Sequence, residues 1–337
     1  MAPPNTSGNN SVLVTGASGM IGRQVVDILQ RESYGVVRAQ VRDKMAAKQK
    51  INNAFDVAMA DFKTADFTMM LEKDYRELTN GCHTVVHTAG LVHMPDAQYQ
   101  EYEVMNVRAT QQLAEACKAN KVNTLVFFSS SAVYGPGPFS NVDETAPIKA
   151  TSPYAVSKST SENFLRSLDG IPRIIVLRPS LVFGEGDRGN LIKMIREIKS
   201  ERYKHIGGGK TGKSVIYARD CANSVLNVLQ KTPPGFHVYN VANPQPVTVF
   251  ELAETIGSAL NIKVGTYNAG ILKMGVKLLE TFMPGKAPVT SEQLEKLTTE
   301  TTCSVNKLVS ETGFKPKTDL DKAVKAEIAW ADQNNLL

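Results

Sequence analysis

The chain has 337 residues, of which 42% are hydrophobic and 21% charged, a composition typical of a folded globular protein that excludes general disorder. The formal charge of +5 is small and Lys and Arg are scattered among acidic residues, so we expect no nucleic-acid partner and favour small anionic molecules. No apolar run reaches the roughly 18 residues that a membrane span needs.

The four cysteines, at positions 82, 117, 221 and 303, lack the close pairs that a zinc site or a disulfide framework would show. We therefore expect buried thiols, no metal and a cytoplasmic location. Residues 1–10 have neither an apolar core nor a basic run, which indicates a disordered polar tail rather than a signal peptide.

Short β-branched runs alternate with longer amphipathic helical patterns in the first half of the chain, which predicts βαβ units around a parallel sheet. The six strands that we place are residues 11–15, 36–41, 55–59, 84–87, 124–129 and 173–178. Residues 11–180 are therefore expected to form a doubly wound α/β domain.

After Pro179 the pattern loosens into glycine-rich loops, and residues 181–213 and 243–337 are expected to form a smaller substrate-binding lobe. Its predicted helices are residues 191–199, 248–260 and 319–333. Residues 214–242 are regular enough to return to the main sheet. The elements expected in that return are a strand at 214–217, a helix at 218–230 and a strand at 236–241.

The first strand runs directly into the glycine loop of residues 16–22, and an amphipathic helix follows at once. Glycines allow a tight turn and a close approach of backbone N–H groups to phosphates, and the helix N-terminus attracts negative charge. This pattern predicts a Rossmann-type dinucleotide site. Its expected contacts in the loop are Gly16, Ser18, Gly19, Met20, Ile21 and Gly22.

The end of the second strand chooses between coenzymes. Arg42 stands where a guanidinium can bind a 2′-phosphate, so NADP(H) is favoured, while the neighbouring Asp43 keeps NAD(H) possible. Asp61 and Phe62 are expected to follow the third strand and to contact the adenine, with a helix cap as the other interpretation of Asp61. Small residues end the fourth strand and let a coenzyme lie close to the backbone: Thr88, Ala89 and Gly90.

Tyr154 and Lys158 stand four residues apart at the start of a predicted helix, so both side chains share one face. A nearby ammonium and an oxidised nicotinamide ring both favour the phenolate, which lets a tyrosine exchange protons. A Tyr-x-x-x-Lys pair alone usually means surface charge. Here it follows a strand that ends in Ser129 and Ser130, whose hydroxyls are expected to face the coenzyme and the substrate oxygen.

At this point the chain resembles the extended short-chain dehydrogenase/reductase family over nearly its whole length. The residues that carry the likeness are 16–22, 86–90, 106–107, 129–135, Tyr154, Lys158, 177–179 and 313–316. The resemblance implies that Tyr154 is the acid/base, that Lys158 lowers its pKa and holds the nicotinamide ribose, and that Ser130 binds the substrate oxygen. Pro179 is expected to contact the coenzyme.

The same resemblance assigns Asn106 to a proton path, although a buried polar helix residue is an equal interpretation. It also implies a homodimer through residues 98–120 and 154–168. His93 and Met94 are candidates for the wall of a small-molecule pocket.

Two reaction classes share this machinery. The chain is expected to be an NADP(H)-preferring oxidoreductase acting on a secondary alcohol or ketone, because Arg42 and Leu181 stand where nucleotide-sugar epimerases tend to carry an acid and an asparagine. Residues 87–89 and 178–180 resemble instead the 3β-hydroxysteroid dehydrogenase and dihydroflavonol reductase branches of the family. A nucleotide-sugar 4-epimerase with tightly bound NAD is the alternative, supported by Asn190 and Lys213 at positions that resemble diphosphate contacts. A non-catalytic binding subunit is a third possibility.

Sugar 4,6-dehydratases resemble the chain as well. They usually follow the serine or threonine with an Asp-Glu pair, and here Ser131 and Ala132 stand there, which disfavours this activity.

Overall fold

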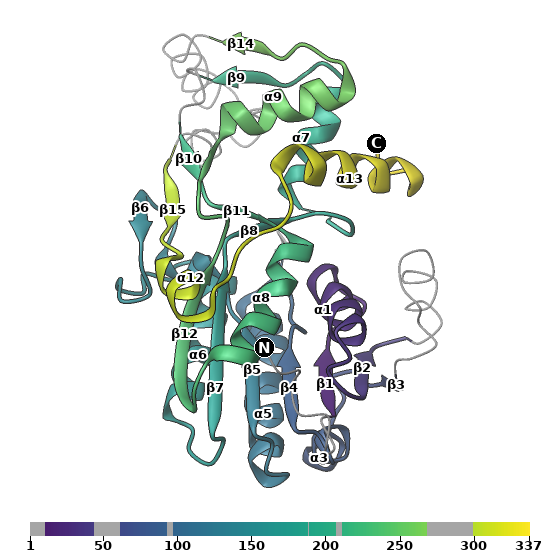
Figure 1. The fold of residues 1–337 in the computed structure, drawn as a ribbon, viewed down its shortest axis with the longest axis vertical. Coiled ribbons are helices and arrows are strands. Elements are labelled where there is room, and N and C mark those ends of the chain that lie inside the picture. The colour runs from purple at the N-terminus through teal and green to yellow at the C-terminus, as the bar shows by residue number, and fades with distance from the viewer. Residues whose placement is uncertain (1–10, 44–60, 93–96, 188, 207–210, 268–298) are drawn as a thin grey trace.

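The structure is a computed structural model that describes residues 11–43, 61–92, 97–187, 189–206, 211–267 and 299–337. Four expectations from the sequence lie outside these residues: the tail 1–10, the strand at 55–59, and the pocket residues His93 and Met94. The described residues form two lobes, with the large parallel sheet in the lower one and the C-terminal helix in the upper one (Figure 1).

Within the described residues, the main sheet has seven parallel strands in the order β12-β7-β5-β4-β1-β2-β3. Their bounds are β1 (Val12–Thr15), β2 (Val37–Val41), β3 (Asp61–Thr64), β4 (Thr84–His87), β5 (Thr124–Phe128), β7 (Arg173–Pro179) and β12 (Gly235–Val241). The chain order reverses between β1 and β4, and open α/β sheets bind ligands beyond the strand ends at such a point. The expected Rossmann-type sheet is thus confirmed.

Helices cover both faces of the sheet because successive strand side chains point to opposite sides. Val12 and Val14 pack in one core with α1 (Met20–Arg31) and α8 (Ala218–Lys231), whereas Leu13 packs in the other core. The helices on that second face are α3 (Glu72–Thr79), α5 (Ala109–Ala119) and α6 (Pro153–Ser167) (Figure 1).

The structure corrects two expectations about strands. The strand that pairs with β2 is β3, in which Asp61 lies opposite Arg38 at the amino end. Asp61 and Phe62 are therefore inside the third strand, and the expectation that they follow it is wrong. The strand at β11 (Val215–Tyr217) pairs with β8 (Leu181–Phe183) in a separate two-stranded sheet, whereas β12 pairs with β7 in the main sheet.

The upper lobe packs α7 (Asn190–Lys199), α9 (Val249–Leu260) and α13 (Leu320–Gln333) around one apolar core. Beside it lies a four-stranded sheet of β6 (Phe139–Val142), β10 (Gly212–Lys213), β13 (Val247–Thr248) and β15 (Thr301–Cys303). The remaining elements are α4 (Tyr99–Tyr102), η2 (Glu103–Arg108), η3 (Ser131–Tyr134), β9 (Lys204–Ile206), β14 (Gly265–Tyr267) and α12 (Asn306–Thr312).

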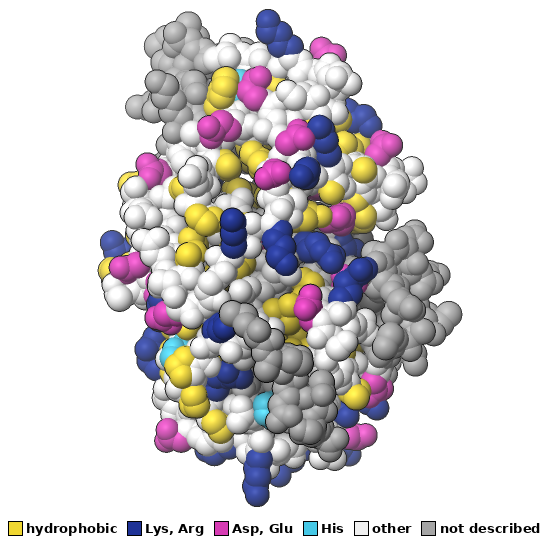
Figure 2. Space-filling view, viewed as in Figure 1, with side chains coloured by type: hydrophobic (Ala, Val, Ile, Leu, Met, Phe, Trp, Pro, Cys, Tyr) yellow, Lys and Arg dark blue, Asp and Glu magenta, His cyan; other side chains and the backbone are white. Residues whose placement is uncertain are grey.

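On the face shown in Figure 2, Lys and Arg side chains are interspersed with Asp and Glu, and several basic side chains lie across the middle, where the two lobes meet. The four cysteines are all free and buried, which confirms the expectation of buried thiols. In the part of the chain that is described, no helix is both long and apolar enough to cross a bilayer.

Candidate active site

The carboxyl ends of β1, β4, β5 and β7 lie next to one another at one edge of the sheet. They bring together the glycine loop of residues 16–22, residues 88–90 after β4, Ser130 after β5, and Pro179 at the end of β7. This edge is the position at which the sequence predicts the coenzyme and the substrate.

The glycine loop is shaped by close backbone contacts. Gly16 has a φ of +65°, and a Cβ there would lie 2.7 Å from the Cα of Ala89, while a Cβ at Gly22 would lie 2.2 Å from the carbonyl oxygen of Gly16. No side chain fits at either position. Helix α1 begins at Met20, and the N–H groups of its first turn have no carbonyl partner within the helix. The loop therefore fits the pyrophosphate of a dinucleotide.

Gln40 braces this loop, and the sequence analysis missed it. Its Oε1 accepts the N–H of Gly16 at 2.9 Å, and its Nε2 donates to the carbonyl oxygen of Ala65 at 2.6 Å. The side chain is buried, with 3% of its surface exposed. Gln40 lies between Ala39 and Val41 in the strand, and a polar amide between two apolar strand residues is the signal that could have revealed it.

Helix α6 carries the proton-transfer residues. Ser152 caps it by accepting the N–H of Ala155 at 3.2 Å, and Pro153 occupies the first helical position, where a missing N–H costs nothing. Tyr154 and Lys158 follow one turn apart on the buried face of the helix, as the spacing predicts.

The hydroxyl of Tyr154 is hydrogen-bonded to Ser130. Burial raises the pKa of Tyr154 to about 12, and the bond with Ser130 opposes this rise. The ring of Tyr102 packs edge-on against Tyr154, with 6.1 Å between centroids. In this environment Tyr154 is therefore a neutral phenol. A positive charge nearby lowers the pKa of a phenol because it stabilises the phenolate.

Lys158 supplies a cation at this place. Its Nζ donates to the carbonyl oxygen of Phe128 at 2.9 Å and lies 6.0 Å from the centroid of the Tyr154 ring. Burial lowers the pKa of Lys158 to about 8, and Glu162 opposes that shift. A Cβ on Gly90 would lie 3.1 Å from the Nζ of Lys158 and 3.0 Å from the Oδ1 of Asn106, so a larger residue there would have to push these side chains aside.

Asn106 lies in η2, a π-helical turn of the kind that concentrates at functional sites. Its Oδ1 accepts the N–H of Leu91 at 2.7 Å, and its Nδ2 donates to the carbonyl oxygen of Leu91 at 3.1 Å and to Ser157 at 2.9 Å. The amide thereby fixes the segment after β4 against α6, beside Lys158. Its part in a proton path stays a prediction.

Some predicted contacts lie elsewhere. Ser129 donates its hydroxyl to Glu162 and is 3% exposed, so it does not face the coenzyme as expected. Asp61 lies at the amino end of β3, with its Oδ2 3.4 Å from the Nε of Arg38. The glycine loop lies at the opposite, carboxyl end of the strands. Ala65, Asp66 and Phe67 are the residues that follow β3.

Three other residues that the sequence predicts as contacts lie on elements that the structure describes. Arg42 is exposed just beyond β2 and adds positive charge near Asp66, whose pKa is lowered mainly by hydrogen bonds from Thr68. Lys213 lies in β10 and donates to the carbonyl oxygen of Thr299. Asn190 begins α7.

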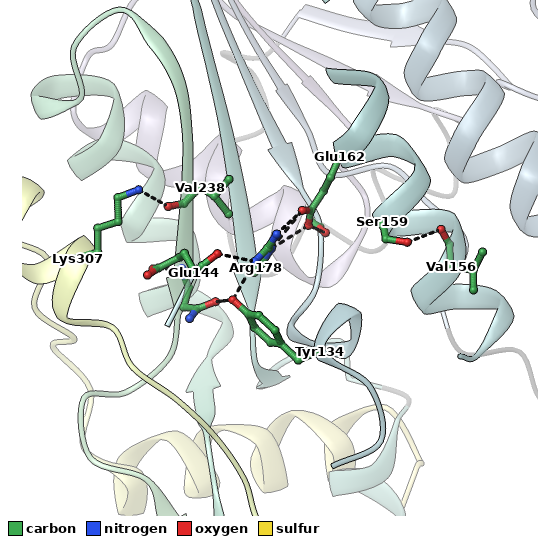
Figure 3. A network of polar contacts seen from close by, with 10 residues as sticks. Tyr134, Glu144, Val156, Ser159, Glu162, Arg178, Val238 and Lys307 are labelled. Carbon is green, nitrogen blue, oxygen red and sulfur yellow. Dashed lines mark hydrogen bonds and ion pairs between the residues drawn. The ribbon is translucent and has the colours of Figure 1, made fainter. Parts of the chain in front are cut away.

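A buried polar network lies behind the serine turn, and the sequence analysis did not foresee it. Arg178 binds both carboxylate oxygens of Glu162 and donates to the hydroxyl of Tyr134 at 2.9 Å (Figure 3). Tyr134 in turn donates to Asn240 at 2.7 Å, and the backbone N–H of Asn240 donates to Glu144. The network joins α6, η3, β7 and β12 beneath the site.

A second buried chain of hydrogen bonds passes through His87. The Nδ1 of His87 lies 2.7 Å from the hydroxyl of Thr15, and its Nε2 lies 3.1 Å from the hydroxyl of Thr110. Thr110 donates to the backbone oxygen of Asn106, so it accepts a proton from the Nε2 of His87. His87 therefore connects the end of β1 with the turn that carries Asn106.

Residues 12–242 match the NAD dependent epimerase/dehydratase family. The N-acetyl-alpha-D-glucosaminyl-diphospho-ditrans,octacis-undecaprenol 4-epimerase of Escherichia coli O157:H7 is 25% identical over 354 residues, which cover 97% of this chain and 98% of that protein. The dTDP-D-glucose 4,6-dehydratase of Bos taurus is 23% identical over 350 residues, which cover 99% of this chain and 92% of that protein.

Among solved structures, UDP-glucuronic acid 4-epimerase from Bacillus cereus in complex with NAD is similar with a TM-score of 0.77 at 20% identity. The likeness covers 96% of this chain and 99% of that structure, and at this identity it shows the fold. The family match runs from β1 to just beyond β12 and therefore includes all seven strands of the main sheet. The chain belongs to the NAD dependent epimerase/dehydratase family, within the extended short-chain dehydrogenases/reductases.

Proposed function

We propose that the protein interconverts a secondary alcohol and a ketone with a nicotinamide coenzyme, and that it does so as a nucleotide-sugar 4-epimerase that keeps NAD bound between turnovers. The observation that carries the proposal is the hydrogen bond between Ser130 and Tyr154 beside Lys158, at the sheet edge that holds the glycine loop. A phenol, a hydroxyl and a cation at a dinucleotide cleft are the groups that alcohol oxidation needs.

Ser130, Tyr154 and Lys158 have different tasks in this proposal. Ser130 holds the substrate oxygen, and Tyr154 takes the hydroxyl proton and later returns it. The ammonium of Lys158 lowers the pKa of Tyr154 and orients the coenzyme ribose. A bound nicotinamide would supply the hydride acceptor and donor. Because one tyrosine handles the proton in both directions, an epimerase needs no second acid/base here.

The epimerase is preferred over the NADP(H) oxidoreductase that the sequence favours, because relatives that cover the chain nearly end to end include 4-epimerases. The dehydratase relative does not change this preference. Ser131 and Ala132 occupy the first turn of η3, where the acid pair of a dehydratase is expected.

A specific observation supports a second candidate, a dehydrogenase or reductase that releases NADP(H) at every turnover. Arg42 is exposed at the carboxyl end of β2, where a guanidinium can bind a 2′-phosphate. Asp43 stands next to it and favours an unphosphorylated ribose. The substrate contacts of Asn190 and Lys213 remain part of the epimerase proposal.

The dinucleotide released when the purified protein is unfolded decides between the two candidates. The epimerase proposal predicts about one NAD per chain by mass spectrometry, without any coenzyme added. Protein that releases no dinucleotide, binds NADPH more tightly than NADH, and loses this preference in Arg42→Ala would contradict it. Arg76→Ala, an exposed arginine on α3, serves as the control.

A further inference from the structure

Three consecutive residues at the end of β5 each bind one residue of α6. Phe128 accepts from Lys158, Ser129 donates to Glu162, and Ser130 is hydrogen-bonded to Tyr154. The α6 partners are spaced by four residues, about 6 Å apart along the helix, and so share one face. Glu162 is thus the third member of a row whose first two members form the proposed proton-transfer pair.

Arg178 holds Glu162 from the other side. Its Nε lies 3.0 and 3.2 Å from the two carboxylate oxygens, and its Nη2 lies 2.6 Å from one of them. Both side chains are nearly inaccessible, with 2% and 1% of their surfaces exposed. Figure 3 shows Arg178 lying between Glu162 and Tyr134. A buried ion pair of this kind is often replaceable by apolar residues without loss of stability, so stability alone does not explain it.

We propose that Glu162, fixed by Arg178, is a positioning residue of the active site: its carboxylate holds the end of β5 through Ser129 and keeps the ammonium of Lys158 in place beside Tyr154. The inference deepens the proposed function and rests on the roles given there to Tyr154 and Lys158. Glu162 itself touches neither coenzyme nor substrate.

The charges around Lys158 show why the carboxylate matters. Burial lowers the pKa of Lys158, and Glu162 is the group that opposes this effect. The charged and titratable groups packed around this place are Tyr154 and Glu162 on α6, His87 on β4, Tyr134 on η3, and Arg178 on β7. Glu162 is the anion among them, and Arg178 reaches α6 at Glu162.

Two single variants separate positioning from a structural role, because they move the charge near Lys158 in opposite directions. Glu162→Gln removes an anion and leaves Arg178, so we expect the pKa of Lys158 to fall by about one unit or more. Arg178→Met leaves the anion unpaired, so we expect that pKa to rise. Each variant leaves one buried charge unpaired and destabilises the fold similarly, so a loss of stability cannot produce opposite shifts.

The pKa is read by NMR titration of isotopically labelled lysines in the substrate-free protein, with Lys158→Met to assign the signal. Glu115→Gln, on the exposed face of α5, is the control and leaves the titration unchanged. If a single variant fails to fold, the double variant Glu162→Gln/Arg178→Met removes both charges of the ion pair, and we expect its Lys158 pKa to lie below that of the wild type because the anion near the ammonium is gone.

Shifts in the same direction for both single variants, or an unchanged pKa in the double variant, would overturn the proposal. The titration needs no turnover. A protein that shows the opposite shifts but no epimerase activity would leave Glu162 as a positioning group and refute the proposed reaction instead.

Discussion

Tyr154 and Lys158 could be predicted from the sequence because their spacing and their place after a strand are local features. The residues that fix β5 against α6, and the residue that braces the glycine loop, could not. Glu162 binds Ser129 across 33 residues and Arg178 across 16, and Gln40 reaches the glycine loop across 24. Contacts over such separations depend on which strands become neighbours, and that order is a property of the assembled sheet.

Lys158 destabilises the fold because its ammonium is buried in the site. Burial lowers its pKa from 10.5 to about 8, so between these pH values the unfolded chain binds more protons at this residue than the folded one. The free energy of unfolding therefore rises with pH in this window, and the full penalty applies below pH 8.

Lys158→Met removes this titration and with it the penalty. We expect the variant to be more stable than the wild type at pH 7 by about 2 kcal/mol, after the lost hydrogen bond to Phe128 is taken into account. The difference shrinks as the pH rises from 8 to 10.5. Urea unfolding at a series of pH values measures it, and a pH-independent difference would refute the assigned shift.

His87 is expected to be a neutral spacer with a fixed tautomer. Burial, with a smaller contribution from Lys158, lowers its pKa to about 3, and Thr110 requires a proton on its Nε2. Nitrogen NMR should show the neutral Nε2–H form throughout pH 5 to 9. The exposed His83 in the same spectrum shows how a protonating histidine behaves. Protonation of His87 near pH 6.5 or an Nδ1–H tautomer would contradict the hydrogen-bond assignment.

At the scale of elements, apolar patterning located the strands buried on both faces and failed at the edge of the sheet. Strand β3 ends the strand order, and Asp61, Lys63 and Thr64 are exposed on it, so its sequence shows no apolar run. Strand β11 is fully buried, and its pattern gives a strand without saying which sheet receives it. Helix bounds were predicted to within one residue for α7, α8, α9 and α13.

The turn from β1 into α1 tolerates a side chain at one glycine better than at another. Gly22→Ala would place a Cβ 2.2 Å from the carbonyl oxygen of Gly16, so we expect a loss of about 2 kcal/mol or more in unfolding free energy and the loss of coenzyme binding. In Gly19→Ala the nearest atom is the same oxygen at 3.1 Å, and a smaller loss is expected. Thermal unfolding and dinucleotide titration compare the two variants. Equal losses in both variants would contradict the close contact described between Gly22 and the carbonyl oxygen of Gly16.

At the scale of the whole molecule, the family and the sheet followed from the sequence, and the reaction did not. The residues that exchange protons are shared by dehydrogenases and epimerases, whereas the choice between them depends on how firmly the two lobes retain coenzyme and substrate. Loops set that property, and loop sequence carries little pattern. The proposal of an epimerase rather than a reductase therefore rests on the relatives, which include 4-epimerases.

The central claim is that Tyr154 moves the substrate proton while hydride leaves and returns. It is tested most directly by incubating the protein as purified with a panel of UDP-hexoses and UDP-hexuronic acids, without added coenzyme, and following the C4 epimer by proton NMR. The account predicts an epimer with the wild type and a rate at least about 100-fold lower with Tyr154→Phe, at unchanged NAD content. Equal rates for the two proteins would contradict it.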